Sequence, residues 1–211
     1  MFIRVIGVNK LFGNSPKDYL DRVYFNWYNT YVQICRPNRI CWLGEVPKKI
    51  DKQDFLHIDL KDAEIVASAD ALPLIDGCFD LIVVANFHES SKEPVLAFKE
   101  ISRALSDDGN LLIFSLVPWS HLAFSSIVQK KLTQLITFKS MRNWLRQEGI
   151  VLQKKVDVFY RPNTNFMFKQ LAFLEAIGPF LAPWLASVNI TMWNKLSPGM
   201  LIDGSSCESW G

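Results

Sequence analysis

Four apolar runs of the sequence end on a glycine or on a polar side chain that can bind a ligand. These end residues are Gly44, Asp59, Asp70 and Asn86. In open parallel sheets, ligands bind outside the carboxyl ends of the strands, near the point where the strand order reverses. A carboxylate at such a place accepts charge-assisted hydrogen bonds from neighbouring hydroxyl groups. If the four runs are strands of one parallel sheet, their ends form one candidate binding edge.

Two further residues extend this candidate edge, because Phe87 and His88 directly follow Asn86. An imidazole with an ordinary pKa exchanges protons near physiological pH, so His88 is a candidate general base. The alternative is an ordinary histidine of a surface loop. His57 lies inside an apolar run and is interpreted as structural.

The runs before these residues have the composition of buried strands. The run 81–85 is continuous and rich in β-branched residues, which is typical of a strand covered on both faces in a parallel sheet. The predicted strands span 39–44, 55–59, 64–69, 81–85, 111–116, 150–160 and 187–194.

Three other segments have apolar residues at helical spacing. Pro16 and Pro94 fit the first turns of two of them, Thr137 fits the N-cap of the third, and Gly149 fits its C-terminal stop. The predicted helices span 16–34, 94–105 and 137–148. Strands that alternate with helices predict an α/β fold with a mostly parallel sheet, and an antiparallel strand is expected to close it.

The middle of the chain carries several motifs in a fixed order. They are Asp70-Ala71, Leu72-Pro73, Phe79-Asp80, the Glu-x-x-Arg-x-Leu segment from Glu100 to Leu105, and Asp107-Asp108-Gly109. Over residues 67–120 this order resembles the methyltransferase type 11 group of the class I S-adenosylmethionine (SAM) dependent methyltransferases. The resemblance implies a Rossmann-like class I methyltransferase fold, with helices on both faces of the sheet, and SAM as the cofactor.

The resemblance also implies roles for single residues. Asp59 takes the position of the carboxylate that binds the ribose hydroxyls, Asp70 that of the adenine-side acid, and Ala71 that of the small residue beside the ring. The alternatives are a polar loop residue for Asp59 and a turn cap for Asp70, a role that suits aspartate. No metal site is predicted. The implied cofactor-binding residues are Gly44, Glu45, Asp59, Asp70, Ala71, Leu72, Asn86 and Phe87.

The segment from Trp42 to Pro47 departs from the family pattern. It has the single glycine Gly44 where family members have two or three, and glycine lets the backbone approach a cofactor closely. Pro47 restricts Val46 and removes a backbone donor. Only about eleven residues separate Gly44 from the next predicted strand, which barely leaves room for a crossover helix.

Two functions therefore stay open. The first is a SAM-dependent methyltransferase that acts on a small, possibly apolar, acceptor. Methyl transfer depends mainly on the alignment of acceptor and methyl group, so it needs no recognisable catalytic residue. The second is a catalytically inactive methyltransferase fold that serves as a binding or interaction protein. Another kind of nucleotide-binding protein is disfavoured, because the sequence has no G-x-G-x-x-G loop.

Composition favours one ordinary cytoplasmic domain. The 211 residues are interpreted as a single domain over 1–211, with a lid-like helical insertion over about 160–186 and a loose tail over 204–211. The four cysteines match neither a zinc pattern nor a disulfide framework and are expected to be reduced. The N-terminal apolar stretch is too short for a signal peptide.

Charge and aromatic residues bear on the partners. Residues 1–110 carry 13 basic and 16 acidic side chains, a net charge of −3, while residues 111–211 carry 10 and 5, a net charge of +5. A basic cluster over 129–155 is either a solvated face or a patch for an anionic partner. No nucleic-acid module is recognisable, so no nucleic-acid partner is expected, whereas peripheral membrane contact stays open.

The segment 171–193 carries only one charge, that of Glu175. Its interpretations are a membrane-spanning helix, an interfacial or lid helix, or a buried helix followed by a strand. The aromatic residues of 166–193 either belong to the core or line a pocket for an apolar acceptor.

Overall fold

The computed structural model describes residues 16–51, 54–60, 63–86, 91–118, 120, 136–160 and 186–197. The predicted lid over 160–186 lies almost wholly outside the described residues, and the predicted tail over 204–211 lies outside them entirely. The proposed single-domain organisation is therefore a prediction for these parts of the chain.

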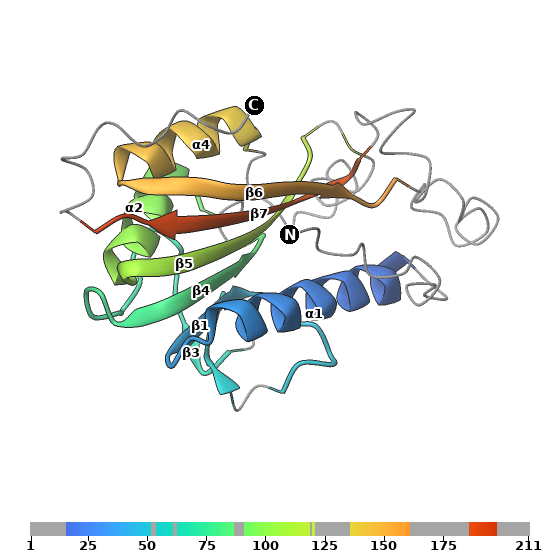
Figure 1. Ribbon diagram of the computed structural model, residues 1–211, viewed down its shortest axis with the longest axis horizontal. Helices are drawn as coiled ribbons and strands as arrows, with labels where there is room; N and C mark the ends of the chain where they lie inside the picture. Colours follow the sequence, from blue (N-terminus) through green and yellow to red (C-terminus); the bar gives the residue numbers. More distant parts are fainter. Residues whose placement is uncertain are drawn as a thin grey trace.

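Seven strands form one sheet in the order β3-β2-β1-β4-β5-β7-β6 (Figure 1). All neighbouring pairs are parallel except those of β7, which runs antiparallel to both β5 and β6. This confirms the predicted α/β fold with its antiparallel final strand. The strands are β1 Ile40–Gly44, β2 Leu56–Asp59, β3 Ile65–Val66, β4 Phe79–Ala85, β5 Leu105–Leu116, β6 Ile150–Val158 and β7 Val188–Lys195.

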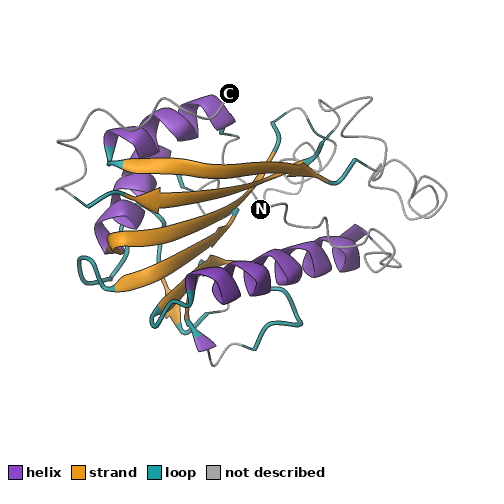
Figure 2. Cartoon of the chain, in the orientation of Figure 1, coloured by secondary structure: helices purple, strands orange, loops and turns teal. Residues whose placement is uncertain are grey.

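Helix α1, Pro16–Cys35, covers one face of the sheet (Figures 1 and 2). Its apolar stripe is rich in tyrosine, and Tyr24 stacks on Phe114 of β5 with ring centroids 4.1 Å apart. Tyr28 meets Trp42 of β1 edge to face at 5.3 Å. Offset and edge-to-face ring pairs add to the burial energy of the rings themselves. The aromatic periodicity of this segment thus serves the core.

Helices α2, Pro94–Ala104, and α4, Phe138–Gln147, cover the other face (Figure 1). They pack together through Phe98 and Trp144, whose ring centroids lie 5.9 Å apart. The Thr137 side chain accepts a hydrogen bond from the Ser140 N–H at 3.2 Å, which confirms the predicted N-cap. Helices on both faces confirm the predicted three-layer architecture.

The connection between β1 and β2 contains no α-helix among its described residues, 45–51 and 54–55. Ile50 and Phe55 of this connection are buried on the α1 face, and the Phe55 ring lies 5.6 Å from that of Trp42. Loop side chains therefore cover sheet surface that a crossover helix would cover. The short spacing after Gly44 had predicted this shortage of room.

Several strand ends differ from the prediction for local reasons. β5 begins at Leu105, earlier than predicted, because the turn at Asp108 is contained within the extended segment. A Cβ on Gly109 would lie only 2.7 Å from the Ser106 carbonyl oxygen, so this position has room for glycine alone. β6 ends at Val158, before Phe159 with its φ of 65°, and β3 is only two residues long.

Within the described residues, no helix is long and apolar enough to cross a membrane. The strand predicted at the end of the 171–193 segment is present as the first part of β7, and residues 171–185 lie outside the described part.

Candidate functional site at the carboxyl edge of the sheet

The carboxyl ends of β1, β2 and β4 bring the predicted residues Gly44, Asp59 and Asn86 to one edge of the sheet. β1 lies between β2 and β4, so the chain order reverses on either side of it. This is the position at which open α/β sheets bind ligands. The sequence-based grouping of these strand ends is thus matched by the topology. We call this side of the sheet the carboxyl edge.

Gly44 and Asn86 form the base of this edge. Both have left-handed backbone conformations, with φ of 98° and 55°, and they form an isolated bridge with one another. The Asn86 N–H donates to the carbonyl oxygen of Phe114 at 3.0 Å. Among the described residues, the buried Asn86 Oδ1 atom has no hydrogen-bond partner, which is rare for a buried polar atom. Asparagine tolerates the left-handed conformation, and the unpaired buried acceptor makes Asn86 a candidate ligand-binding position.

Two side chains hold the turn that follows β1. Nε2 of buried His57 lies 3.0 Å from the Gly44 carbonyl oxygen, and because a carbonyl only accepts, this nitrogen carries the proton. The Trp42 Nε1–H donates to the Glu45 carbonyl oxygen at 3.2 Å. Ring N–H groups therefore fix two successive carbonyl oxygens of the turn, those of Gly44 and Glu45. The structural interpretation of His57 agrees with these contacts.

The Glu45 side chain points to α1 instead of into the core. Its carboxylate forms an exposed ion pair with Lys17 at 2.8 Å, and this hydrogen bond raises the pKa of Lys17. Further along, the Ile50 N–H donates to the Pro47 carbonyl oxygen at 3.0 Å and closes a tight turn. The segment after the single glycine is thus held by side chains and a turn, where related sequences continue into a helix.

Asp59 ends β2 with one carboxylate oxygen already engaged. Its Oδ1 accepts a hydrogen bond from the N–H of Leu60 at 2.7 Å, and its backbone carbonyl accepts one from Ala67 at 3.2 Å. Within the described part of the chain, the second carboxylate oxygen has no side-chain or backbone partner. The carboxylate is therefore oriented by the backbone and keeps one oxygen available for a ligand hydroxyl.

Asp70 lies in the turn after β3. Its carboxylate accepts a short hydrogen bond from the Ser68 hydroxyl, and the Ala71 N–H donates to the Ser68 carbonyl oxygen at 3.2 Å. The Ser68 hydrogen bond, with a smaller contribution from Ser91, lowers the pKa of Asp70. The contact with Ser68 places Asp70 beside the 68–71 turn, whereas the Leu72 N–H is bound by Glu100, so the turn-cap alternative for Asp70 stays a prediction. The hydrogen bond from Ser68 is compatible with ligand binding, because the Asp70 carboxylate stays ionised and can accept further hydrogen bonds.

A residue pair on α2 fixes the loop that carries Ala71 and Leu72. The Arg103 guanidinium donates to the carbonyl oxygens of Leu72 at 3.1 Å and Leu74 at 2.7 Å. It also pairs with Glu100 at 2.7 Å, and Glu100 accepts the Leu72 N–H at 3.3 Å. This pairing lowers the pKa of Glu100 and raises that of Arg103. The Glu-x-x-Arg motif, used above only as a mark of resemblance, thus positions the candidate adenine side of the site.

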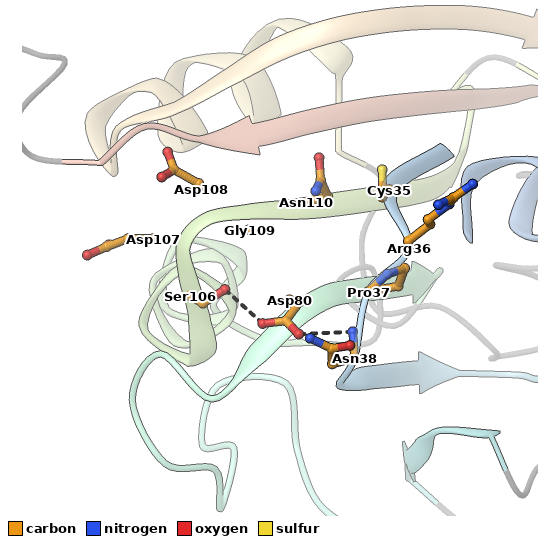
Figure 3. A pocket seen from close by; sticks show the side chains of 10 residues that line it. All are labelled: Cys35, Arg36, Pro37, Asn38, Asp80, Ser106, Asp107, Asp108, Gly109 and Asn110. Atoms are coloured by element: carbon orange, nitrogen blue, oxygen red, sulfur yellow. Dashed lines mark hydrogen bonds between the residues drawn. The ribbon is translucent and has the colours of Figure 1, made fainter. Parts of the chain in front are cut away.

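The Phe79-Asp80 motif serves the opposite, amino edge of the sheet. Asp80 accepts hydrogen bonds from the N–H groups of Asn38 and Arg39, both at 3.1 Å, and ties the start of β4 to that of β1. A hollow of about 240 Å³ opens here, and Figure 3 shows Asp80 bonded to Asn38 and Ser106 within it. The hollow is open and polar, and it lies away from the strand ends predicted to bind a cofactor.

Two predicted residues, Phe87 and His88, lie outside the described residues, so the general-base hypothesis for His88 stays a prediction. Lys139, Arg142 and Arg146 form an exposed basic face of α4, which fits both a solvated face and a patch for an anionic partner, so this alternative stays open. Among the described residues, no group of three or more histidine, cysteine or acidic side chains is arranged to hold a metal ion.

Residues 46–113, about a third of the chain, match the family model of the methyltransferase domain. This confirms the resemblance found in the motifs from Asp70 to Gly109. No functionally curated protein matches the sequence significantly.

Solved structures share the fold at low sequence identity. The [4+2]-cyclase SpnF is 15% identical, with a TM-score of 0.58 over 86% of this chain and 83% of its own. The MccD protein is 15% identical, with a TM-score of 0.55 over 87% and 100%. An S-adenosylmethionine dependent methyltransferase from Mesorhizobium loti is 14% identical, with a TM-score of 0.53 over 79% and 96%. These likenesses establish the class I methyltransferase fold.

Proposed function

We propose that this chain, which has the class I methyltransferase fold and that family's central motifs, is a SAM-dependent methyltransferase acting on a small molecule. The observation that carries the proposal is the convergence of Gly44, Asp59 and Asn86 with the Asp70 loop at the carboxyl edge. Bound SAM would supply an electrophilic methyl group on a sulfonium, which is a good leaving group.

The residues present fit this cofactor. Asp59 has an oriented carboxylate with one oxygen left over, which suits a ribose hydroxyl. Asp70 has a lowered pKa and stays ionised, which suits an acceptor of hydrogen bonds from an adenine-side donor. Asn86 offers a buried amide oxygen without a partner beside Gly44. The Asp59 and Asp70 carboxylates are held by hydrogen bonds within the protein before any ligand arrives, so little of the binding energy is lost in ordering them.

Related sequences have two or three glycines after the first strand, whereas this chain has only Gly44. Hydrogen bonds that hold the Gly44 turn bear on this difference. Glycine-rich loops work by bringing backbone close to the cofactor. Here Gly44 has a left-handed conformation. The ring of His57 binds the Gly44 carbonyl oxygen, and that of Trp42 binds the Glu45 carbonyl oxygen. The turn is thus held by side chains, and glycine stands at the position with φ of 98°, where a Cβ would be strained.

The test is isothermal titration of the purified protein with SAM and with S-adenosylhomocysteine. We expect Asp70→Ala to weaken binding by about tenfold or more, because a hydrogen bond to a charged group contributes about 1.5–3 kcal/mol. Asp107→Ala is the matched control, since Asp107 is an exposed acid at the amino edge, 3.8 Å from Lys195. It should bind like the natural sequence.

The inactive-fold alternative makes the opposite prediction. Two observations support this alternative. The described residues between β1 and β2 contain no α-helix, and one solved structure with a similar fold is described as a [4+2]-cyclase. A folded, monodisperse sample that binds neither ligand would contradict the proposal and favour this alternative.

Location and partners complete the proposal. We place the protein in the cytoplasm, which agrees with Cys35, Cys41 and Cys78 being free thiols. The partner is a small-molecule acceptor, with no nucleic acid involved. Contact with an anionic membrane through the basic face of α4 stays a prediction.

A further inference from the structure

A row of basic side chains on α4 follows the outermost strand β6. The Nζ atom of Lys155 on β6 lies over the ring of Phe138, 5.0 Å from its centroid, at the start of α4. Arg142 and Arg146 follow Phe138 at intervals of four residues, so they continue the same row of the helix along β6 (Figure 1). Lys139 lies beside Arg142, three positions before it. We call Lys139, Arg142 and Arg146 the basic stripe, and this side of the molecule the β6 edge.

The helix α4 supplies no neutralising partner for the basic stripe. No acidic residue lies three or four positions from any of its members, where an ion pair within the helix would form. Arg142 instead has a like charge three positions before it and another four positions after it, which slightly destabilises a helix. The three side chains of the stripe are exposed, whereas Met141 and Leu145 on the inner side are buried. The folding of α4 therefore does not explain this row of positive charge.

The two outer edges of the sheet carry opposite charges. The segment 138–158, which forms α4 and β6, has five basic and two acidic side chains, a net charge of +3. The segment 51–66, which ends in β2 and β3 at the opposite edge, has two basic and five acidic side chains, a net charge of −3. Charges separated in this way orient a protein in an electric field. A negatively charged surface would therefore attract the β6 edge and repel the β3 edge.

The β6 edge lacks the apolar anchors that a tight protein partner needs. Among the described residues, the large exposed apolar side chains belong to neither α4 nor β6, since they are Ile34, Leu60, Val66, Ile75, Val95 and Leu96. Stable protein–protein interfaces have an apolar core inside a polar rim. Phe138 and Trp144 of α4 pack against the core, so neither ring lies free to stack on a nucleic-acid base. The edge thus offers charge alone, which is what the headgroups of an anionic bilayer attract.

β6 is also poorly suited to pairing with a strand of a second copy. Its register with β7 shifts between Leu152 and Lys154, and the two lysines Lys154 and Lys155 follow this irregularity. Bulges and lysines are the means by which natural edge strands avoid pairing with another chain. A contact between the basic edge of one copy and the acidic edge of the next would also not close into a symmetric dimer.

We propose that the β6 edge binds reversibly to the headgroups of an anionic phospholipid bilayer, with the basic stripe as its contact surface. The contact is electrostatic and requires no inserted apolar side chain. It assigns one kind of anionic partner, a lipid surface, to the basic cluster noted in the sequence. This inference goes beyond the proposed methyl transfer and does not depend on it.

The test is co-sedimentation of the full chain with vesicles, in the absence of SAM. One set contains equal parts of phosphatidylcholine and phosphatidylglycerol, and the other contains phosphatidylcholine alone. We expect binding to the anionic vesicles only, and its loss as the salt concentration rises, because salt screens exposed charges. No binding to the anionic vesicles, or equal binding to both sets, would overturn the proposal.

Two triple variants separate the basic stripe from net charge. Replacing all three stripe residues by glutamine should weaken vesicle binding on the order of 100-fold, because each Lys or Arg near an anionic surface contributes about fivefold in affinity. The matched control replaces Lys48, Lys49 and Lys99, three exposed lysines elsewhere, by glutamine. It removes the same total charge and should bind within about twofold of the natural sequence. Equal losses in the two variants would mean that net charge alone acts, and would overturn the proposal.

A conservative variant and two further measurements exclude a folding defect and the other partners. Arg142→Lys with Arg146→Lys keeps the charge and should keep vesicle binding, whereas a loss would point to a partner read by the guanidinium fork and overturn the proposal. The stripe variant should have an unchanged or slightly raised melting temperature, since like charges are removed. Tighter binding to duplex DNA than to anionic vesicles, or self-association that the stripe variant abolishes in sedimentation velocity, would assign the edge to another partner and overturn the lipid proposal.

Discussion

At the amino edge of the sheet, the Asp80 carboxylate accepts two backbone N–H groups and also lies 3.5 Å from Arg39 and from Ser106. At the carboxyl edge, the described part of the chain gives the Asp59 carboxylate one backbone N–H and gives Asn86 Oδ1 no donor. Both edges are built from the same kinds of residue at the ends of the same strands. The amino edge uses them to join β1 to β4, whereas the carboxyl edge keeps part of their hydrogen-bonding capacity unused.

This difference separates stability from binding. A polar group with all its partners contributes to folding, and its removal destabilises the protein. A polar group held in place without its full set of partners contributes to folding weakly and is available to a ligand. Substitutions at the amino edge should therefore mainly lower the stability of the fold, and substitutions at the carboxyl edge should mainly weaken ligand binding. A residue that contributes to both stability and binding is the exception.

Arg103 is such a supporting residue, and its replacement should have the largest effect. Arg103→Met removes the donors to Leu72 and Leu74 and the partner of Glu100. Since the network is partly exposed, we expect a loss of about 1–2 kcal/mol in unfolding free energy. SAM binding should weaken by about tenfold or more, because the Asp70 loop loses its support.

Urea denaturation and calorimetric titration measure the two effects of Arg103→Met. Lys99→Met is the control, because Lys99 lies exposed on the same helix. Full SAM affinity in Arg103→Met would show that the loop is positioned without this clamp.

Replacement of His57 should weaken SAM binding, because the hydrogen bond from its ring holds the Gly44 turn. His57→Phe keeps a ring in the core but leaves the Gly44 carbonyl without its donor. We expect SAM affinity to fall about tenfold. His57→Gln should restore much of the affinity, because its side-chain amide can donate from a similar position. Equal affinities for Phe and Gln variants would mean that the ring only fills space.

Asp80→Ala tests the amino edge and should give the reverse pattern. The N–H groups of Asn38 and Arg39 lose their acceptor, so the unfolding free energy should fall by about 1 kcal/mol. SAM affinity should be unchanged, because the strand ends at the carboxyl edge keep their contacts. Weaker SAM binding at unchanged stability would break the distinction between the edges.

The sequence predicted the fold and the grouping of the strand ends well. Continuous apolar runs such as 81–85 and the helical spacing of 94–105 depend on local periodicity, which is visible without a structure. The ends Gly44, Asp59 and Asn86 could be grouped because parallel strands share one edge.

The contacts between distant residues could not be read in the same way. The bond between His57 and Gly44 spans 13 residues, and that between Arg103 and Leu74 spans 29. Periodicity says which side of a strand a residue occupies, but it does not say which distant carbonyl that residue meets.

The smallest expected effect concerns the pH dependence of Asp70. Its pKa is lowered below the ordinary value of 3.8, chiefly by the Ser68 hydroxyl. A depressed carboxyl pKa stabilises the folded state above the unfolded pKa, and this contribution is lost as the pH falls through the folded pKa. Because Asp70 is partly exposed, the contribution to stability should be only a few tenths of a kcal/mol.

For binding, the same shift keeps Asp70 ionised throughout the neutral and mildly acidic range. The part of the SAM affinity that Asp70→Ala removes should therefore be constant between about pH 5 and pH 8. Titrations of the natural sequence and of Asp70→Ala over this range measure the difference directly. A difference that declined toward pH 5 would mean that a group with a higher pKa, at the carboxyl edge or in the ligand, provides the contact instead of Asp70.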